Sequence, residues 1–259
     1  MVTSHLRAHT LVLTVSFGTV CWQFGAPTAA MAQSGSVADL AAQSDIYRAG
    51  GNGPTLDGID PFLVPITAIG SGRFATFGAS GSWNCCSGGG AFQGPDGGPT
   101  GNPPTNINAW NKIGGIYGLD NMWLVGLFLG DGLPSMTPPT RSYSSPSAFS
   151  ATSYLDIELG QPFFIGDGLT GTGSGVVQKF LVPDAATRLF LGVVDGYGFQ
   201  GNPGYYFDNV GSMAVDWHIA DGSSVVPEPH AWLLLATGLL GLGVAARRRE
   251  REDDGAGET

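Results

Sequence analysis

The amino-acid sequence predicts an all-β fold, an antiparallel β-sandwich with long loops rich in glycine and proline. Glycine accounts for 42 of the 259 residues and proline for 17, whereas only 12% of the residues are charged. This composition is poor in helix formers and rich in turn formers. The middle of the chain also carries many large apolar residues, which a folded domain requires and a disordered segment lacks.

Strand-like runs separated by turn clusters fill the chain between residues 62 and 219. Consecutive runs are not joined by helix-length crossovers, so antiparallel pairing is expected. In the last run Met213, Val215, Trp217 and Ile219 alternate with small or polar residues and would share one face. The predicted strands cover residues 62–69, 73–77, 122–129, 153–159, 176–182, 187–194 and 211–219, and segments 78–121 and 131–152 are expected to be long loops.

The N-terminus has the features of a secretory signal peptide. A weakly basic start with Arg7 precedes an apolar run at 11–17, and a small-x-small cleavage site ends at Ala32. The apolar run is too short and too interrupted to span a bilayer of about 30 Å. We therefore expect export and cleavage near Ala32.

The C-terminus combines three features in a fixed order. A Pro-Glu-Pro motif precedes an uncharged apolar run at 231–246, and a cluster of arginines follows it. The run predicts one short hydrophobic helix that crosses a membrane, with the arginines on the cytoplasmic side. A plain membrane anchor would not require the Pro-Glu-Pro motif. The motif and cluster residues are Pro227, Glu228, Pro229, Arg247, Arg248 and Arg249.

This order of parts resembles the PEP-CTERM sorting signal, which exosortases read. The resemblance implies that the secretion machinery exports the protein and that its C-terminal helix holds the precursor in the membrane. It further implies that exosortase cleaves the chain near the motif and that the protein is then transferred to the cell surface or extracellular polysaccharide. The expected organisation is a signal peptide (1–32), a small, polar and partly helical N-terminal extension (33–59), a β-sandwich domain (60–221), the sorting segment with its transmembrane helix (226–251) and an acidic tail (252–259).

Charge and motifs argue against two classes of function. The formal net charge is −10, and the chain lacks the basic stripe that nucleic-acid binding requires. The sequence contains neither a Gly-x-Ser-x-Gly elbow nor a pair of histidines at metal-binding spacing. Asp156 and Glu158 would fall on one face of a predicted strand, where two acids are more often solvated than catalytic. We expect a protein that is not an enzyme.

Two adjacent cysteines, Cys85 and Cys86, lie on the longer predicted loop. An exported protein meets oxidising conditions, which permit disulfides. Ordinary disulfides hold their Cα atoms about 5.5–6 Å apart, so a bond between neighbours closes a strained ring. A vicinal disulfide, two free thiols and intermolecular disulfides all remain open.

The segment 189–215 is the richest candidate for a binding site. A predicted strand delivers Asp195 into a loop of glycines and aromatic residues, and Asp208 and Asn209 open the next strand. Ca²⁺ takes about 6–8 oxygen ligands, which these side chains, loop carbonyls and water would supply. The alternative, which the chemistry alone favours, is a hairpin whose Asp and Asn side chains satisfy the loop backbone. The aromatic residues that offer a stacking surface for a sugar ring are Tyr197, Phe199, Tyr205, Tyr206 and Phe207.

Asp195, the glycine- and aromatic-rich loop and the run Asp208-Asn209-x-Gly-Ser are similar to the final hairpin of the bacterial calcium-dependent galactophilic lectins. The resemblance spans roughly residues 60–219 and implies a jelly-roll β-sandwich in which calcium binds two sugar hydroxyls. It assigns the calcium ligands to the side chains of Asp195, Asp208 and Asn209 and to backbone oxygens of Phe77 and Tyr205. The lectins' His and Gln sugar contacts have no counterpart in this chain, so galactose specificity is not implied. The candidate carbohydrate contacts are Asp195 and Asp208, with Gln93, Asp96 or Asp120 as substitutes for the missing ones.

Together these features predict an exported, exosortase-sorted, non-enzymatic protein of the cell surface or exopolysaccharide, with a calcium-dependent carbohydrate-binding β-sandwich. One alternative is a structural matrix protein without a small-molecule ligand. The other is a glycan hydrolase that uses Asp156 and Glu158.

Overall fold

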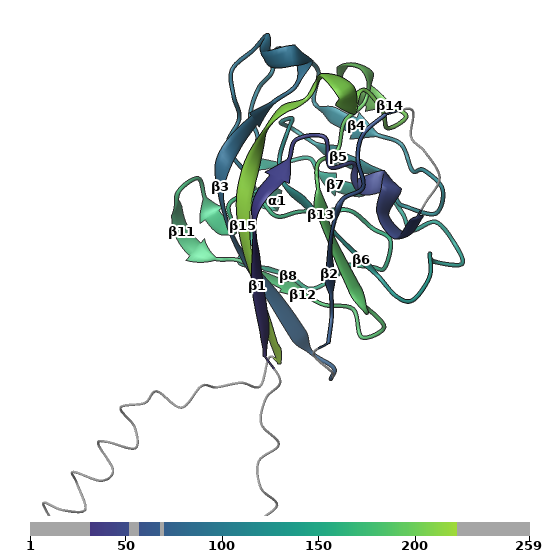
Figure 1. Cartoon of the computed structure of the whole chain (residues 1–259). Helices are drawn as coiled ribbons and strands as arrows, with labels where there is room; N and C mark the ends of the chain where they lie inside the picture. Colours follow the sequence, from purple (N-terminus) through teal and green to yellow (C-terminus); the bar gives the residue numbers. More distant parts are fainter. Residues whose placement is uncertain (1–31, 52–56, 68–69, 222–259) are drawn as a thin grey trace, which may run out of the picture.

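The computed structural model describes residues 32–51, 57–67 and 70–221 and confirms the all-β class (Figure 1). One sheet has five strands in the order β1-β15-β3-β12-β8. Strands β15 and β3 pair over 12 residues, from Val210 opposite Asn84 to Asp221 opposite Arg73. The strands are β1 (Gln33–Ala41), β15 (Val210–Asp221), β3 (Arg73–Asn84), β12 (Lys179–Leu181) and β8 (Ser153–Tyr154).

A four-stranded sheet in the order β2-β13-β6-β9 packs against the first sheet. Its strands β6 and β13 are nearly continuous apolar runs, and every residue of β6 is buried. Aromatic contacts join the two sheets, because Phe62 packs on Trp217 with ring centroids 5.7 Å apart and Phe163 packs on Phe180 at 5.5 Å. The strands are β2 (Phe62–Pro65), β13 (Arg188–Gly192), β6 (Val125–Leu129) and β9 (Phe163–Phe164).

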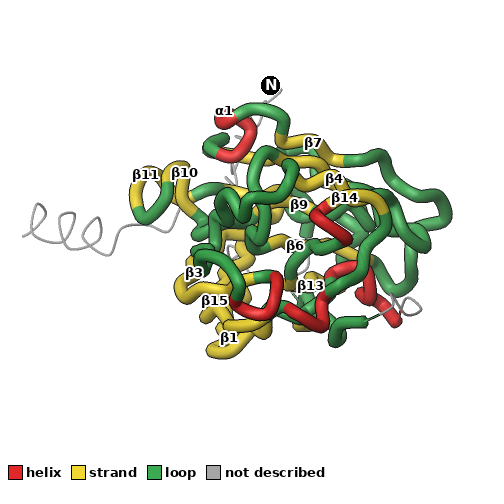
Figure 2. Tube along the Cα trace, turned by 90° about the horizontal axis from the view of Figure 1, so that it is seen from above, coloured by secondary structure: helices red, strands yellow, loops and turns green. Residues whose placement is uncertain are grey.

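A third, smaller sheet has the order β14-β4-β5-β7, and the β10–β11 hairpin lies apart from the three sheets and protrudes from the body (Figure 2). Among the described residues, helical structure is confined to one short α-helix and four short 3-10 segments. The strands are β14 (Gln200–Gly201), β4 (Thr105–Ile107), β5 (Ile116–Gly118), β7 (Arg141–Tyr143), β10 (Leu169–Gly171) and β11 (Ser174–Val177). The helical turns are α1 (Pro146–Phe149), η1 (Ile46–Gly51), η2 (Cys86–Gly88), η3 (Tyr197–Phe199) and η4 (Tyr206–Asp208).

The alternation predicted for the last strand is confirmed. The side chains of Met213, Val215, Trp217 and Ile219 are buried in the core, whereas the residues between them are exposed. Trp217 fits because Gly35 lies opposite it in β1: a Cβ atom at Gly35 would overlap the indole ring.

The N-terminal segment 33–59 differs from the prediction. Residues 33–41 form strand β1, which pairs with β15 from Gln33 opposite Ile219 to Ala41 opposite Ser212, so the helical pattern expected there is wrong and these residues are part of the sandwich. In the described part of the segment, helical structure is confined to the turn η1. The small polar residues of β1 suit a strand at the edge of the sheet. Such a strand is held by backbone hydrogen bonds to β15 and does not need to bury large apolar side chains.

The two predicted loops also contain strands. Segment 78–121 holds the second half of β3 together with β4 and β5, and segment 131–152 holds β7 and α1. Conversely, the strand predicted at 153–159 ends at Tyr154. Three pairings, β8 with β12, β14 with β4 and β5 with β7, run parallel, because long connections return these segments in the same direction.

The sandwich has two distinct poles (Figure 1). Strand β1 begins and β15 ends at one pole, since Gln33 lies opposite Ile219. The opposite pole carries the end of β3 at Asn84 and the start of β15 at Val210. The eleven steps between these twelve strand residues, at about 3.4 Å each, separate the poles by roughly 37 Å.

The predicted terminal segments lie outside the described residues: the signal peptide apart from Ala32, the sorting segment 226–251 with Pro227, Glu228, Pro229, Arg247, Arg248 and Arg249, and the tail 252–259. Across residues 32–51, 57–67 and 70–221, no helix is long and apolar enough to span a membrane.

Candidate functional site

Asp195 is a buried carboxyl group at the pole away from the chain ends. It follows β13, and its Oδ1 accepts a hydrogen bond of 2.7 Å from the Gly196 N–H. Burial raises the pKa of Asp195 well above its usual range, and the nearby charges of Asp208 and Asp57 raise it further. The Asn209 side chain lies near the same carboxyl group and lowers its pKa, but burial outweighs this effect. Ionisation of the Asp195 carboxyl group in the folded protein therefore costs free energy.

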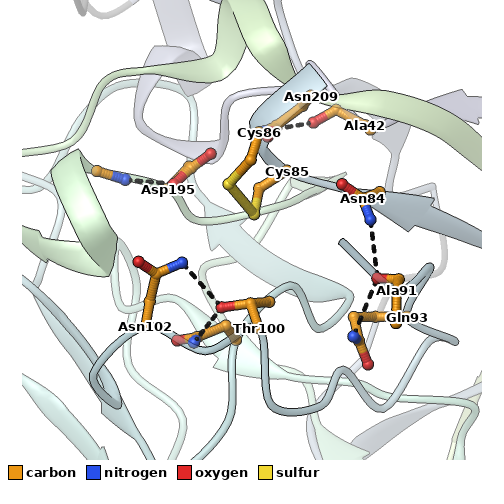
Figure 3. Close-up of a disulfide and its surroundings, with 12 residues drawn as sticks. Ala42, Asn84, Cys85, Cys86, Ala91, Gln93, Thr100, Asn102, Asp195 and Asn209 are labelled. Atoms are coloured by element: carbon orange, nitrogen blue, oxygen red, sulfur yellow. Dashed lines mark hydrogen bonds between the residues drawn. A yellow bond between two sulfur atoms is a disulfide. The ribbon is translucent and has the colours of Figure 1, made fainter. Parts of the chain in front are cut away.

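Asn209 is buried directly beside this carboxyl group. Its Nδ2 donates a 3.1 Å hydrogen bond to the carbonyl oxygen of Ala42 (Figure 3). Its Oδ1 makes no hydrogen bond to any described residue. Asp208 precedes it and lines the same cavity as Asp195. The structure thus brings together Asp195, Asp208 and Asn209, the three predicted side-chain ligands.

A cavity of about 320 Å³ opens beside Asp195. The loop 195–208 contributes one wall and the segment after β3 contributes another. The backbone of Tyr205 is left-handed, with φ +70°, which turns the chain at the cavity. The lining residues are Cys85, Cys86, Asn102, Asp195, Gly196, Tyr197, Gly198, Phe199, Tyr205 and Asp208.

Three exposed aromatic rings, named here the aromatic shelf, lie in a row beside this cavity: Tyr197 and Tyr205 line it, and Phe207 lies next to Tyr205. Their exposed fractions are 74%, 42% and 63%. The Tyr197 and Tyr205 ring centroids are 5.2 Å apart, and those of Tyr205 and Phe207 are 6.3 Å apart. The other two aromatic residues of the loop, Phe199 and Tyr206, are buried. They anchor the loop from inside and leave the shelf open to solvent.

Cys85 and Cys86 form a vicinal disulfide, one of the three states that the sequence left open. Figure 3 shows the sulfur atoms beside Asp195. Cys85 is buried at the end of β3, whereas Cys86 is exposed and begins the turn η2. Both residues line the cavity.

Phe77 does not join this cluster. It lies in the middle of β3 opposite Trp217, seven residues before Asn84 and therefore roughly 23 Å from that pole. Its ring is buried against Phe163 and Phe180. The backbone oxygen expected as a calcium ligand is thus remote from Asp195.

Gln93 and Asp96 also lie apart from the cavity beside Asp195. Gln93 is buried, and its Nε2 donates to the carbonyl oxygens of Ala91 and Pro99. Asp96 lines a separate cavity of about 220 Å³ together with Asp120. The Asp96 carboxyl accepts a hydrogen bond from the Asp167 N–H at 2.9 Å, and burial raises its pKa. These residues support loops rather than the cavity beside Asp195.

Asp156 and Glu158 line a third cavity, of about 450 Å³. Neither acid belongs to a strand, because β8 ends at Tyr154. Arg141 donates from Nη2 to Asp156 Oδ1 at 2.7 Å, and this hydrogen bond lowers the pKa of Asp156. Arg141 also lies over the ring of Tyr143, 5.7 Å from its centroid. Asp156 is therefore held ionised by a fixed partner.

Two parts of the site were missed from the sequence. Asn102 comes from a predicted loop and carries no local signal that would place it beside Asp195. The packing of η2 against η4 is also a tertiary contact. In the described part of the chain, no group of three or more His, Cys, Asp or Glu side chains is arranged to hold a metal ion. A cation here would depend on amide and backbone oxygens in addition to Asp195 and Asp208.

Comparison with known proteins bears on the end of the chain. No curated protein and no solved structure matches the sequence, so the resemblance of the middle domain to galactophilic lectins has no support from a relative. Residues 225–249 match the PEP-CTERM protein-sorting motif. The match confirms the expected sorting signal, and this chain accordingly carries the C-terminal address of an exported protein that exosortase processes.

Proposed function

We propose that this protein acts by binding rather than catalysis, and that it binds neutral carbohydrate of the extracellular polysaccharide at the cavity beside the aromatic shelf. The observation that carries the proposal is the shelf itself. Three rings, with Tyr205 next to both Tyr197 and Phe207, remain exposed although burying aromatic surface is favourable. Clustered apolar surface beside a polar cavity is typical of a ligand site.

The chemistry around the shelf suits a sugar. A pyranose has an apolar C–H face, which stacks on an aromatic ring, and hydroxyl groups at its edge. The carboxyl groups of Asp195 and Asp208 and the amide of Asn102 line the same cavity and would hydrogen-bond these hydroxyls. The net charge of −10 disfavours an acidic polysaccharide, so a neutral one is the better match.

The position of the cavity supports a role at the cell surface. Asp208 and Asn209 directly precede β15, whereas the sorting motif begins four residues after β15 ends. The candidate site therefore lies at the pole opposite the membrane-directed end of the sandwich. A precursor tethered by its C-terminus would present the shelf outward.

Calcium is a second component of the proposal, supported by the buried Asp195 carboxyl group and by the Asn209 Oδ1 beside it, which has no hydrogen-bond partner among the described residues. A bound cation would offset the cost of the buried Asp195 carboxylate and would give the Asn209 Oδ1 a partner. Asp195, Asp208 and Asn209 would hold it, with backbone oxygens and water completing about 6–8 ligands. When bound, the ion would supply direct coordination of sugar hydroxyls. Phe77 is not among the proposed ligands, because it lies remote from this pole.

The test is glycan-array binding of the exported protein in calcium and in chelator, followed by calorimetry on the best ligand and by assay for released sugars. Binding of neutral glycans without turnover is the expected result, and loss of binding in chelator would support the calcium component. Absence of binding to any glycan would favour a structural matrix protein. Release of sugars would favour a hydrolase at the Asp156 and Glu158 cavity.

A further inference from the structure

We propose that the Cys85–Cys86 disulfide forms a ligand-contacting wall of this cavity, and that the cavity keeps its binding shape only while the disulfide is oxidised. The inference rests on the proposed carbohydrate site and adds a condition for its activity. Its first observation is the position of the disulfide: both cysteines line the cavity together with Asp195 and Tyr205. Figure 3 shows the sulfur pair lying toward Asp195.

The sulfur atoms suit this contact chemically. A disulfide lacks strong hydrogen-bonding groups, and its polarisable sulfurs favour apolar and aromatic partners. Because Tyr197 and Tyr205 line the same cavity, it would present apolar surface from the disulfide and from the rings in addition to its polar groups. Such a cavity would hold a sugar ring by its apolar faces and leave its hydroxyls to Asp195 and Asp208.

The backbone of the disulfide turn shows why oxidation matters for shape. Cys86 and Ser87 have φ values of +64° and +54°, so two consecutive residues with side chains occupy the left-handed region. Such residues rarely adopt this conformation, and it persists only where surrounding structure holds it. Within the turn, the Gly89 N–H donates to the Cys86 carbonyl oxygen at 3.0 Å. The covalent ring between Cys85 and Cys86 is a further constraint.

The disulfide turn also supports the aromatic shelf. Turn η2, which begins at Cys86, contacts η4, which contains Phe207 and Asp208 and follows Tyr205. Release of η2 would remove a packing partner from the segment that carries two of the three shelf rings. The shelf and the disulfide wall are therefore expected to loosen together.

The redox step is an ordinary thiol–disulfide exchange. An external dithiol supplies two electrons and two protons, the S–S bond breaks, Cys85 and Cys86 become thiols, and the dithiol leaves as its own disulfide. Outside the cytoplasm the oxidised state is favoured. The carbohydrate site would thus become competent after export and stay incompetent in the reducing cytoplasm.

The experiment compares the exported full-length protein in oxidised form, after reduction with dithiothreitol, and as the Cys85→Ser/Cys86→Ser variant. Hydrogen–deuterium exchange is measured for residues 195–208, with β6 and β13 as internal controls. Retention on agarose, cellulose and curdlan beads is measured in parallel. We expect reduction and the double variant each to speed exchange in 195–208 and to lower retention at least tenfold, while exchange in β6 and β13 stays unchanged.

Each other outcome has a defined meaning. Equal retention of oxidised and reduced protein would overturn the inference and leave the carbohydrate site standing. If no form is retained on any bead, the carbohydrate proposal fails, and the exchange data alone decide whether the disulfide holds the cavity. Unchanged exchange in 195–208, or faster exchange throughout β6 and β13, would also overturn the inference, because the disulfide would then be dispensable or would hold the whole fold.

Discussion

Removal of the Tyr197 ring is the sharpest test of the aromatic shelf. Tyr197 is 74% exposed, and its ring centroid lies 5.2 Å from that of Tyr205. Because an exposed side chain contributes little to folding, Tyr197→Ala should change the free energy of unfolding by no more than about 0.5 kcal/mol. The same substitution should weaken carbohydrate binding strongly, which separates a binding role from a structural one.

The size of the binding effect follows from the area available for stacking. A fully buried tyrosine covers roughly 150–250 Å², so one open face of the Tyr197 ring offers roughly 80 Å² to a ligand. At about 25 cal/mol per Å² this area contributes about 2 kcal/mol. The dissociation constant should therefore rise about 30-fold.

Calorimetry with the glycan selected on the array measures this change, and denaturant unfolding measures stability on the same samples. Tyr197→Phe keeps the ring and should bind within about threefold of wild type, because stacking does not need the hydroxyl. Phe92→Ala is the matched control, since Phe92 is an aromatic residue of 54% exposure that does not line the cavity. Wild-type affinity of Tyr197→Ala, or an equal loss in Phe92→Ala, would refute the assignment of the shelf.

Three further outcomes are expected. Asp195→Asn should raise the thermal unfolding temperature in chelator at pH 7. The pKa of Asp195 is raised in the folded protein, so its carboxyl group destabilises the fold as the pH rises through that pKa, and the asparagine removes this effect. The gain should shrink toward pH 4, and equal effects at both pH values would contradict the burial argument. Gly168→Ala should lower the free energy of unfolding, measured with denaturant, by about 3 kcal/mol or more, because φ is +84° and a Cβ atom would overlap the Phe77 carbonyl oxygen. The control Gly173→Ala, where φ is +65° and the surrounding space is open, should lower it by only about 1 kcal/mol. Trp83→Phe should lower the free energy of unfolding by about 1–3 kcal/mol, because the buried indole N–H donates a 2.6 Å hydrogen bond to the Met122 carbonyl oxygen. An unchanged free energy of unfolding would show that water takes the place of the indole N–H at this carbonyl.

Much of the fold could be predicted because its signals are local. The buried face of β15 could be predicted from the alternation of Met213, Val215, Trp217 and Ile219. The positions of β6 and β13 could be predicted from their continuous apolar runs. Strand β1 and the second half of β3 could not be predicted in this way, since their residues are small or polar. Their backbone hydrogen bonds come from β15, which lies more than a hundred residues away in the chain.

The candidate site was predicted only in part. Asp195, Asp208 and Asn209 meet as expected because two neighbouring elements bring them to one pole. Gln93 and Phe77 lie elsewhere, since their places depend on the length and register of β3 rather than on local pattern.

The sequence by itself determined the all-β class, the sorting address at 225–249 and the chemical character of the loop from Asp195 to Asn209, because composition, periodicity and motif order are properties of the chain. Only the tertiary structure decided which aromatic rings stay exposed, that Cys85 and Cys86 face Asp195, and that this pole lies opposite the sorted end. These features depend on strand register and on packing between segments that are distant in the chain, which no local pattern encodes.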